Sequence, residues 1–374
     1  MKITILSPVY PFRGGIANFT NILASELLKN NDIQIITFKR QYPELLFPGK
    51  TQYEISQNKL NIKSSQLVDS INPLNWFNVG RKVKSDKPDI LIFSFWMPFF
   101  APAFGTIAKI VKKNNHTKIL SICHNVIPHE TKPGDLSFTK YFFSKVDYFV
   151  LLSQKVKSDL LKIKPAAKFK VLFHPVYSSF GEPVNKKAAK EHLNLNYPKI
   201  ILFFGLVREY KGLDILLKAM NLIKQNPDVK LVIAGEFYQE KIIYDNLIKK
   251  YQISESIFII DKFIDSEEVK YYFSAADAVV LPYKDATQSG IVQVAVNFGK
   301  PLIGSNVGGL GEIIKNGYNG YLVEKNNPEE LANAIEKFYA EDKETEFTQN
   351  IKKEADKYSW TKFVNELMIL ISEK

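Results

Sequence analysis

The chain has 374 residues, enough for two or three domains, and its 45% hydrophobic and 13% aromatic content is typical of a globular protein and excludes a largely disordered one. Its single cysteine, Cys123, excludes an intrachain disulfide, and no apolar run approaches the ~20 residues of a membrane-spanning helix. The apolar run at the N-terminus is too short for a secretory signal, so we expect a cytoplasmic protein.

The formal net charge of +11 points to an acidic partner or to solubility alone. The basic residues are spread along the chain rather than gathered in one run. An anionic membrane surface or an anionic lipid carrier is the functional alternative to solubility, which makes the inner face of the membrane a candidate peripheral location. Nucleic acid would also match the charge, but we do not predict it as a partner.

Short apolar strands alternate with amphipathic helices in the first half of the chain. The spacing predicts strands over 3–6, 33–38, 90–95, 118–123, 148–152 and 171–173, with helices over 16–28, 104–111 and from Ser153. The segment 41–72 is the least regular and receives no element. Strands that alternate with helices imply a parallel, doubly wound sheet.

The alternation stops at residues 174–183, which are rich in Pro, Gly and Ser and form the predicted linker. It then restarts with strands over 200–204, 230–234, 257–260, 278–281 and 301–304, and helices over 186–193, 213–223, 241–251, 265–273, 291–298, 328–339 and 360–371. The helix from Asp265 is expected because Asp265-Ser266-Glu267-Glu268 has the capping-box spacing. The fold class predicted is α/β, with two Rossmann-like domains facing across a cleft.

The loop Asp285-Ala286-Thr287-Gln288-Ser289-Gly290 is the first candidate ligand site. It follows a buried strand and opens the helix that begins near Ile291. Free backbone N–H groups and the positive end of a helix dipole make such a position suited to a phosphate. Gly308-Gly309, after the next strand, can bring backbone close to the same ligand. We therefore expect a nucleotide diphosphate here.

A second candidate is the loop after strand 200–204, where Gly205 is followed by Arg208 and Lys211. Two fixed cations beside a helix N-terminus can stabilise a departing diphosphate without a metal ion. The alternative is that these are two ordinary surface charges.

Gly14-Gly15 lies between the first strand and the first helix, where a phosphate turn or a plain tight turn would fit equally. The pattern GxGxxG is missing, which argues against a nicotinamide enzyme.

Cys123-His124-Asn125 ends a predicted strand, with His129 and Glu130 just beyond. A histidine in this position can hydrogen-bond a sugar hydroxyl or move a proton, or it can be structural. The spacing matches no zinc motif, and no GxSxG is present, so we predict neither a metal site nor a serine hydrolase.

Taken together, these segments resemble the retaining glycosyltransferases of family 4, which have the GT-B fold. The resemblance covers nearly the whole chain and is carried by GGIANFTNILASEL, SICHNVIPHE, FFGLVREYKGLDILLKAM, LVIAGE, SAADAVVLPY, FGKPLIGSNVGGLGEII, NGYNGYLV, PEELANAI and YSWTKFVNEL. It implies domains at 1–178 and 179–358, and a helix within 359–374 that crosses back to the N-terminal domain.

The resemblance also implies roles for individual residues. Arg208, Lys211 and His124 are the implied catalytic residues, with the two cations neutralising the phosphates and His124 near the transferred sugar. The implied donor-binding set is Gly14, Gly15, Gly205, Glu236, Phe263, Asp285, Thr287, Gln288, Ser289, Gly290 and Ile291. The implied acceptor-side set is Asn125, His129 and Glu130.

The chain departs from the family pattern at two points. The positions of the family's two paired glutamates are occupied by Ala286 and Val294. Asp285 lies one residue from the first position and can substitute for the glutamate there, and Gln288 or Gln293 can supply a hydrogen bond. In addition, Leu206 stands where the family usually has its arginine, so we assign that role to Arg208.

We therefore predict a retaining, metal-independent glycosyltransferase of bacterial surface polysaccharide or glycolipid synthesis. It would move a hexose-type sugar from a UDP- or GDP-sugar, its co-substrate, to a glycan or lipid-linked acceptor, with no cofactor. A GT-B sugar-nucleotide epimerase and a non-catalytic nucleotide-sugar-binding protein are the alternatives, the second because both glutamates are missing.

Overall fold

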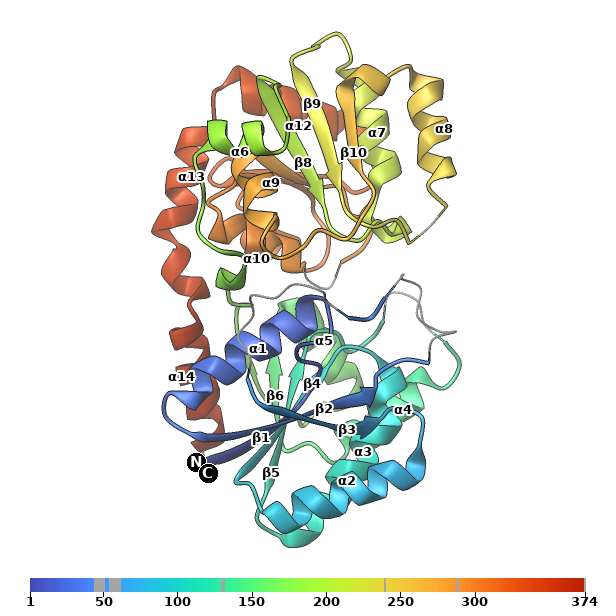
Figure 1. The fold of residues 1–374 in the computed structure, drawn as a ribbon, viewed down its shortest axis with the longest axis vertical. Helices are drawn as coiled ribbons and strands as arrows, with labels where there is room; N and C mark the ends of the chain where they lie inside the picture. The colour runs from blue at the N-terminus through green and yellow to red at the C-terminus, as the bar shows by residue number, and fades with distance from the viewer. Residues whose placement is uncertain (44–50, 54–61, 129–131, 239, 287–288, 373–374) are drawn as a thin grey trace. The chain divides into compact units, whose positions relative to one another are not determined.

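The structure is a computed structural model that describes residues 1–43, 51–53, 62–128, 132–238, 240–286 and 289–372. It divides into two compact units, Met1–Pro175 with Tyr358–Lys374 and Val176–Lys357. Each unit contains its own parallel sheet with helices on both faces (Figure 1). The sequence placed the corresponding ends at residues 178 and 358.

The first unit is built on a parallel sheet with strand order β3-β2-β1-β4-β5-β6-β7 among the described residues. Its central strands are mostly apolar and are buried except for Lys118 at the start of one of them, as expected when helices cover both faces of a sheet. The strands are β1 Lys2–Leu6, β2 Asp32–Arg40, β3 Ser64–Asp69, β4 Ile90–Phe95, β5 Lys118–Cys123, β6 Tyr148–Leu151 and β7 Lys168–Val171.

The helices of the first unit form two layers. The chain crosses from β1 to β2 in one direction and from β4 to β5 in the other, and right-handed crossovers then place the connecting helices on opposite faces. On one face, α2, α3 and α4 pack against one another in turn (Figure 1). The helices are α1 Gly15–Leu28, α2 Pro73–Asp86, α3 Ala101–Val111, α4 Asp135–Phe143, α5 Gln154–Ile163 and α14 Trp360–Ser372.

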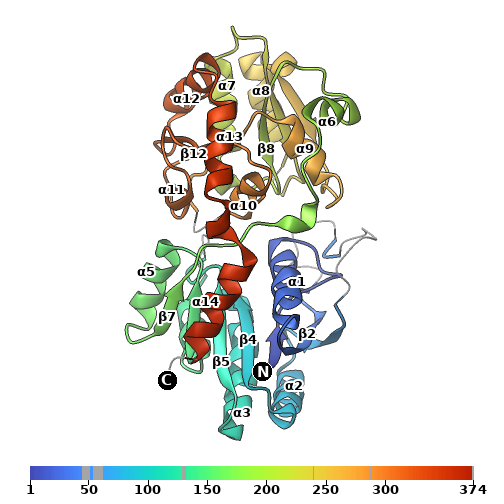
Figure 2. The same cartoon turned by 90° about the vertical axis from the view of Figure 1, so that its left-hand side faces the viewer.

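The C-terminal helix α14 belongs to the first unit, where it lies beside α1 (Figure 2). The ring of Phe19 on α1 is 5.0 Å from the ring of Trp360 and 5.7 Å from that of Phe363. Lys170 and Glu366 form an ion pair between β7 and α14. Buried aromatic contacts of this kind hold the end of the chain on the N-terminal sheet.

The second unit has a parallel sheet with strand order β10-β9-β8-β11-β12-β13. Its strands are β8 Lys199–Phe204, β9 Val229–Ala234, β10 Ile257–Ile260, β11 Ala278–Leu281, β12 Leu302–Ser305 and β13 Gly320–Val323. Its helices are α6 Lys186–His192, α7 Leu213–Leu222, α8 Ile242–Tyr251, α9 Val269–Ala275, α10 Gly290–Asn297, α11 Leu310–Ile313, α12 Pro328–Ala340 and α13 Glu344–Lys353. The strand order reverses between β8 and β11, where open α/β sheets bind their ligands.

Several elements differ from the sequence prediction. The helix expected at Asp265 begins at Val269, because the Asp265 carbonyl accepts the N–H groups of Glu268 and Val269 and a turn comes first. The strand expected at 171–173 lies earlier, as β7. The sequence analysis assigned no element to β3, α2, α4, α11, β13 or α13.

Candidate functional site

The candidate site of the second unit lies where two loops leave the sheet at its switch point. β8 and β11 are neighbouring parallel strands, so their carboxyl ends share one edge. The loop after β8 carries Gly205, Arg208 and Lys211, and the segment after β11 leads to the start of α10. The two loops come close together at Gly212, which has a φ of +69°. A Cβ there would lie 1.9 Å from the Pro282 carbonyl oxygen, so the close approach requires glycine.

Lys211 is buried, with 7% of its surface exposed. Burial first, and then the charge of Arg208, lower the pKa of its ammonium group from 10.5 to about 7. Its Nζ lies 5.9 Å from the centre of the Tyr283 ring, whose face attracts a cation. No carboxylate of the described residues pairs with Lys211, so the site holds a buried cation that lacks an anion.

Gly205 allows the approach of Lys211. Its φ is +93°, and a Cβ there would lie 3.2 Å from both Lys211 Nζ and Ile291 Cδ1. Gly205 therefore lies close to both the Lys211 ammonium group and the first turn of α10. A Cβ at position 205 would require one of the two neighbours to shift by a few tenths of an ångström.

Arg208 completes the positive charge of the site. Its guanidinium carbon lies 4.9 Å above the Tyr238 ring, and its carbonyl accepts the N–H of Lys211 at 3.0 Å. Within the part of the chain that the structure describes, Arg208 makes no ion pair either. Two cations that repel each other and lack a carboxylate are stabilised by any anion that binds between them.

The N-terminus of α10 supplies the second anion-binding element. Its cap residue, Ser289, makes no side-chain capping bond, since its Oγ is 3.1 Å from the Tyr283 hydroxyl and shares a hydrogen bond with it. A Cβ on Gly290 would lie 3.3 Å from the Tyr177 ring. Tyr177 and Tyr283 are contacts that the sequence analysis missed. The predicted residues Thr287 and Gln288 lie outside the described residues.

Three other predicted donor residues follow neighbouring strands at the same edge. Glu236 comes after β9 and is 3% exposed, and Phe263 comes after β10 and is partly buried. Asp285 comes after β11 and is exposed, whereas its neighbour Ala286 is buried. The position that matches the family's first glutamate therefore faces the interior, and Asp285 faces outward.

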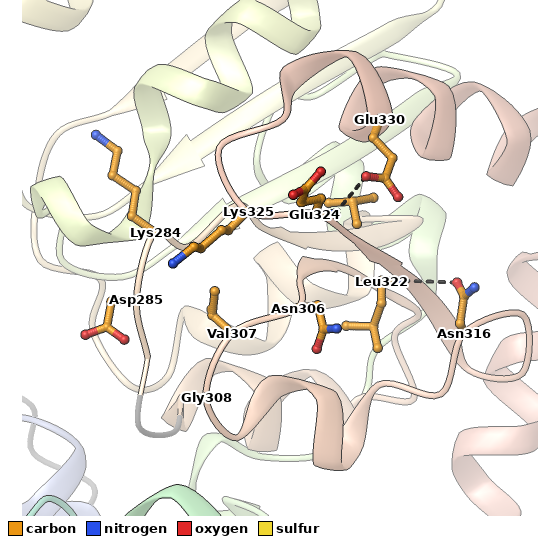
Figure 3. Close-up of a pocket in the computed structure, with 11 residues that line it drawn as sticks. Lys284, Asp285, Asn306, Val307, Gly308, Asn316, Leu322, Glu324, Lys325 and Glu330 are labelled. Carbon is orange, nitrogen blue, oxygen red and sulfur yellow. Dashed lines mark hydrogen bonds between the residues drawn. The ribbon is translucent and has the colours of Figure 1, made fainter.

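Asp285 lines a pocket of about 740 Å³ at the ends of β11, β12 and β13 (Figure 3). Lys325 reaches across it toward the loop that carries Lys284 and Asp285. Lys284 pairs with Asp214 at 3.0 Å, and Glu330 accepts the N–H of Glu324 at 2.8 Å. The lining residues are Lys284, Asp285, Asn306, Val307, Gly308, Asn316, Leu322, Val323, Glu324, Lys325 and Glu330.

The position of the family's second glutamate is also buried. Val294 is 2% exposed on α10. Gln293 beside it is 1% exposed, and its Oε1 has no hydrogen-bond partner among the described residues. A buried amide oxygen without a partner costs about 1–3 kcal/mol, which a ligand or water can recover. The Gln293 amide, which the sequence analysis named as a source of a hydrogen bond, is therefore buried.

In the first unit, Gly14 and Gly15 form the start of α1. Gly14 has a φ of +108°, and a Cβ there would meet no described atom within 4 Å. No side chain caps this helix. The geometry leaves backbone accessible from the side of Gly14, as an anion site at a helix start requires.

His124 directly follows β5 and is 6% exposed. Its ring lies 4.9 Å from the Phe19 ring and 6.1 Å from the His174 ring. Burial first, and then the charge of His174, hold the pKa of His124 well below 6.5, so the imidazole is neutral. Its Nε2 has no hydrogen-bond partner in the described part of the chain. Asn125 follows and is partly buried, whereas His129 and Glu130 lie outside the described residues.

The described residues contain no group of three or more His, Cys, Asp or Glu side chains placed to hold a metal ion. None of their helices has the length and apolar character needed to cross a membrane.

Comparison with known proteins places these features in context. Residues 185–358 match the family model "Glycosyl transferases group 1". Two uncharacterized glycosyltransferases of Methanocaldococcus jannaschii are similar along almost their whole length. One is 27% identical, covering 97% of this chain and 96% of the relative, and the other is 26% identical, covering 98% and 96%.

Solved structures share the fold at lower identity. A glycosyltransferase from Rickettsia africae has a TM-score of 0.76 at 20% identity, over all of both chains. Anabaena HepE in complex with UDP-glucose has a TM-score of 0.77 at 15% identity, also over all of both chains. The predicted fold class, two Rossmann-like domains of the GT-B type, is thus confirmed.

Proposed function

We propose that the chain is a retaining glycosyltransferase of family 4, and the match of residues 185–358 to the family model "Glycosyl transferases group 1" supports this. It moves a hexose-type sugar from a nucleotide-diphosphate sugar to a glycan or lipid-linked acceptor in bacterial surface polysaccharide or glycolipid synthesis. The donor is a UDP- or GDP-sugar, and neither a metal ion nor another cofactor takes part.

The observation that carries this proposal is the pair of cations without a carboxylate, Arg208 and buried Lys211, beside the uncapped start of α10. A donor diphosphate supplies the missing negative charge. Ser289, Gly290 and Ile291 present backbone N–H groups to it at the positive end of the helix. These groups are worth more in a buried site than in water, because little solvent screens them.

In the reaction, the bond between the anomeric carbon and the phosphate oxygen breaks, and its electron pair leaves with the diphosphate. Arg208, Lys211 and the α10 N-terminus stabilise the charge that develops. The acceptor hydroxyl attacks the same face of the sugar, so the anomeric configuration is kept. Its proton passes to the leaving diphosphate, which acts as the base. The products are the glycosylated acceptor and the nucleoside diphosphate.

Two further residues are assigned to the sugar. Asp285 takes over the hydroxyl contacts of the missing first glutamate, since it is exposed and lines the pocket at the end of β11. His124 offers its unpartnered Nε2 to a sugar hydroxyl as a neutral imidazole. A neutral imidazole can hydrogen-bond an uncharged sugar hydroxyl, and it avoids the cost of burying the charge of an imidazolium.

A panel of UDP-, GDP- and ADP-sugars tests the proposal by protection against thermal unfolding. A donor at about 100 times its dissociation constant should stabilise the chain by about 2.7 kcal/mol. The protecting donor is then incubated with acceptor glycans and lipid-linked sugars in the presence of EDTA, and the product linkage is assigned by NMR. Inversion of the anomeric centre, or protection by no donor, would refute it.

A further inference from the structure

The positive charge of the chain belongs to one unit. The first unit, Met1–Pro175 with Tyr358–Lys374, has 27 Lys and Arg against 13 Asp and Glu. The second, Val176–Lys357, has 23 against 26. The net charge of +11 is therefore a surplus on the first unit over a weakly acidic second unit. Solubility alone gives no reason for this division, whereas an anionic partner of the first unit does.

Large apolar side chains are exposed on the same unit at the starts of two helices. On α2, Leu74 is 76% exposed, the highest value among the large apolar residues described, and Phe77 is 48% exposed. On α4, Leu136 and Phe138 are 53% and 45% exposed. Exposing four such side chains forgoes the stabilisation that burial would bring, so a partner that covers them is favoured.

The outer face of α2 combines these apolar residues with cations. Val79, Gly80 and Val83 face the protein interior. Leu74, Phe77 and Arg81 follow at intervals of three and four on the opposite side, with Lys84 at its border. Arg81 and Lys84 make no ion pair among the described residues. The face is thus apolar at the beginning of the helix and basic toward its end.

The helices α2 and α4 belong to one layer. Both pack against α3: a Cβ on Gly80 of α2 would lie 3.0 Å from Ile110 of α3, and one on Gly105 of α3 would lie 2.5 Å from Tyr141 of α4. All three point their N-termini to the same edge of the sheet, because each runs back against the parallel strands it connects (Figure 1). The exposed leucines and phenylalanines therefore lie along one edge of one layer.

We propose that this α2–α4 surface, formed by Leu74, Phe77, Arg81, Lys84, Leu136 and Phe138, docks on an anionic lipid bilayer. The apolar side chains enter the interface between headgroups and acyl chains, and the cations meet the lipid phosphates. This docking rests on the proposed function, because its purpose is to bring the first unit to a lipid-linked acceptor. A nucleic acid would match the cations but would leave Leu74 exposed.

Vesicle flotation of the full chain, without donor, tests the proposal. Vesicles of phosphatidylglycerol and phosphatidylcholine in equal parts should bind the chain, vesicles of phosphatidylcholine alone should bind it weakly, and salt should reduce binding. The double variant Arg81→Gln/Lys84→Gln should lower the partition coefficient about 25-fold, since each cation contributes about fivefold. Leu74→Ser/Phe77→Ser should lower it at least about tenfold.

Helix α8 of the second unit offers matched controls. Ile242 and Ile243 are 53% and 52% exposed, and Lys249 and Lys250 are exposed near the end of the same helix. The variants Ile242→Ser/Ile243→Ser and Lys249→Gln/Lys250→Gln should bind vesicles as the original chain does. Thermal unfolding of every variant shows that it is folded.

Three results would overturn the proposal. The first is failure of the original chain to bind anionic vesicles. The second is equal loss of binding in the α2 and α8 variants. The third is binding of a DNA oligonucleotide as tight as that of the vesicles and unchanged by Leu74→Ser/Phe77→Ser, which would indicate a general polyanion surface. Donor binding is measured separately by thermal protection, so failure of the membrane surface and failure of the proposed function are distinguishable.

Discussion

Lys211 and Gly205 are in close contact, since a Cβ on Gly205 would lie only 3.2 Å from Lys211 Nζ. Gly205→Ala should therefore weaken nucleotide binding about tenfold as well as strain the backbone, whose φ is +93°. Titration calorimetry with the nucleoside diphosphate measures the affinity. Gly317→Ala is the control, because Gly317 also has a positive φ, +74°, but its Cβ would meet nothing within 4 Å. Equal loss of affinity in both variants would contradict the contact.

Lys211→Met should reduce transfer at least about 100-fold, because it removes a preorganised charge partner of the leaving diphosphate, worth about 3 kcal/mol. The same change should raise the free energy of unfolding of the unliganded chain at pH 7, since a buried cation no longer has to be desolvated. Initial rates and urea unfolding provide the two measurements. Lys218→Ala on the exposed side of α7 should change neither. Full activity of Lys211→Met would exclude Lys211 from the site.

Donor binding should weaken as pH rises above about 7. Burial gives Lys211 a pKa of about 7 in the free chain, below its value of 10.5 in the unfolded chain. A bound diphosphate favours the charged form and raises that pKa, so binding takes up a proton above pH 7 and none well below it. The dissociation constant should be constant below pH 7 and rise up to tenfold per pH unit above it.

Calorimetry at pH 8 in two buffers of different ionisation enthalpy counts the protons taken up. The uptake should approach one and should disappear in Lys211→Met. The effect of pH on folding has the opposite sign. Burial of the charged Lys211 lowers the free energy of unfolding, and this penalty is fully present below pH 7 and disappears as pH rises toward 10.5. Affinity independent of pH between 7 and 9 would show that Lys211 is charged in the free chain.

His124→Phe should lower transfer about 10- to 100-fold and leave nucleotide affinity unchanged, because the imidazole is assigned to the sugar. The pKa of His124 is held well below 6.5 by burial, so its titration should add no inflection to the rate between pH 6 and 8. Rate profiles over this range, with nucleotide binding measured in parallel, separate the two effects. His116→Phe is the control, since His116 is exposed and pairs with Asp89.

Asp285→Ala should weaken binding of the complete donor about tenfold while binding of the nucleoside diphosphate alone is unchanged. The reason is that Asp285 lines the pocket beside the phosphate site and is assigned to sugar hydroxyls. Competition between donor and diphosphate measures both affinities. Asp228→Ala, at an exposed turn before β9, controls for loss of a surface charge. Equal weakening of the binding of both ligands would indicate that Asp285 contacts the phosphates and not the sugar.

The success of the sequence prediction varied with burial. The ranges of β4, β5, β10 and β11 were predicted to the residue. For β4, β5 and β11 the reason is that a strand covered on both faces is a nearly continuous apolar run. β10 is a partly buried edge strand, but its four residues are all apolar. β3 was missed because it is an edge strand of mixed polarity, with only Val68 buried. α2 was missed because Leu74 and Phe77 lie on its exposed face, which disrupts the apolar pattern of an ordinary surface helix.

The sequence by itself determined the two doubly wound sheets, the loops that leave their carboxyl edges, and the presence of Arg208 and Lys211 between a strand and a helix. These follow from local patterns, which the order of residues contains directly. Only the tertiary structure decided that Lys211 is buried and has a lowered pKa, that Asp285 is exposed at the edge of a pocket while Ala286 is buried, and that α2 and α4 belong to one layer. Desolvation and side-chain direction depend on contacts between segments far apart in the chain, which no local pattern records.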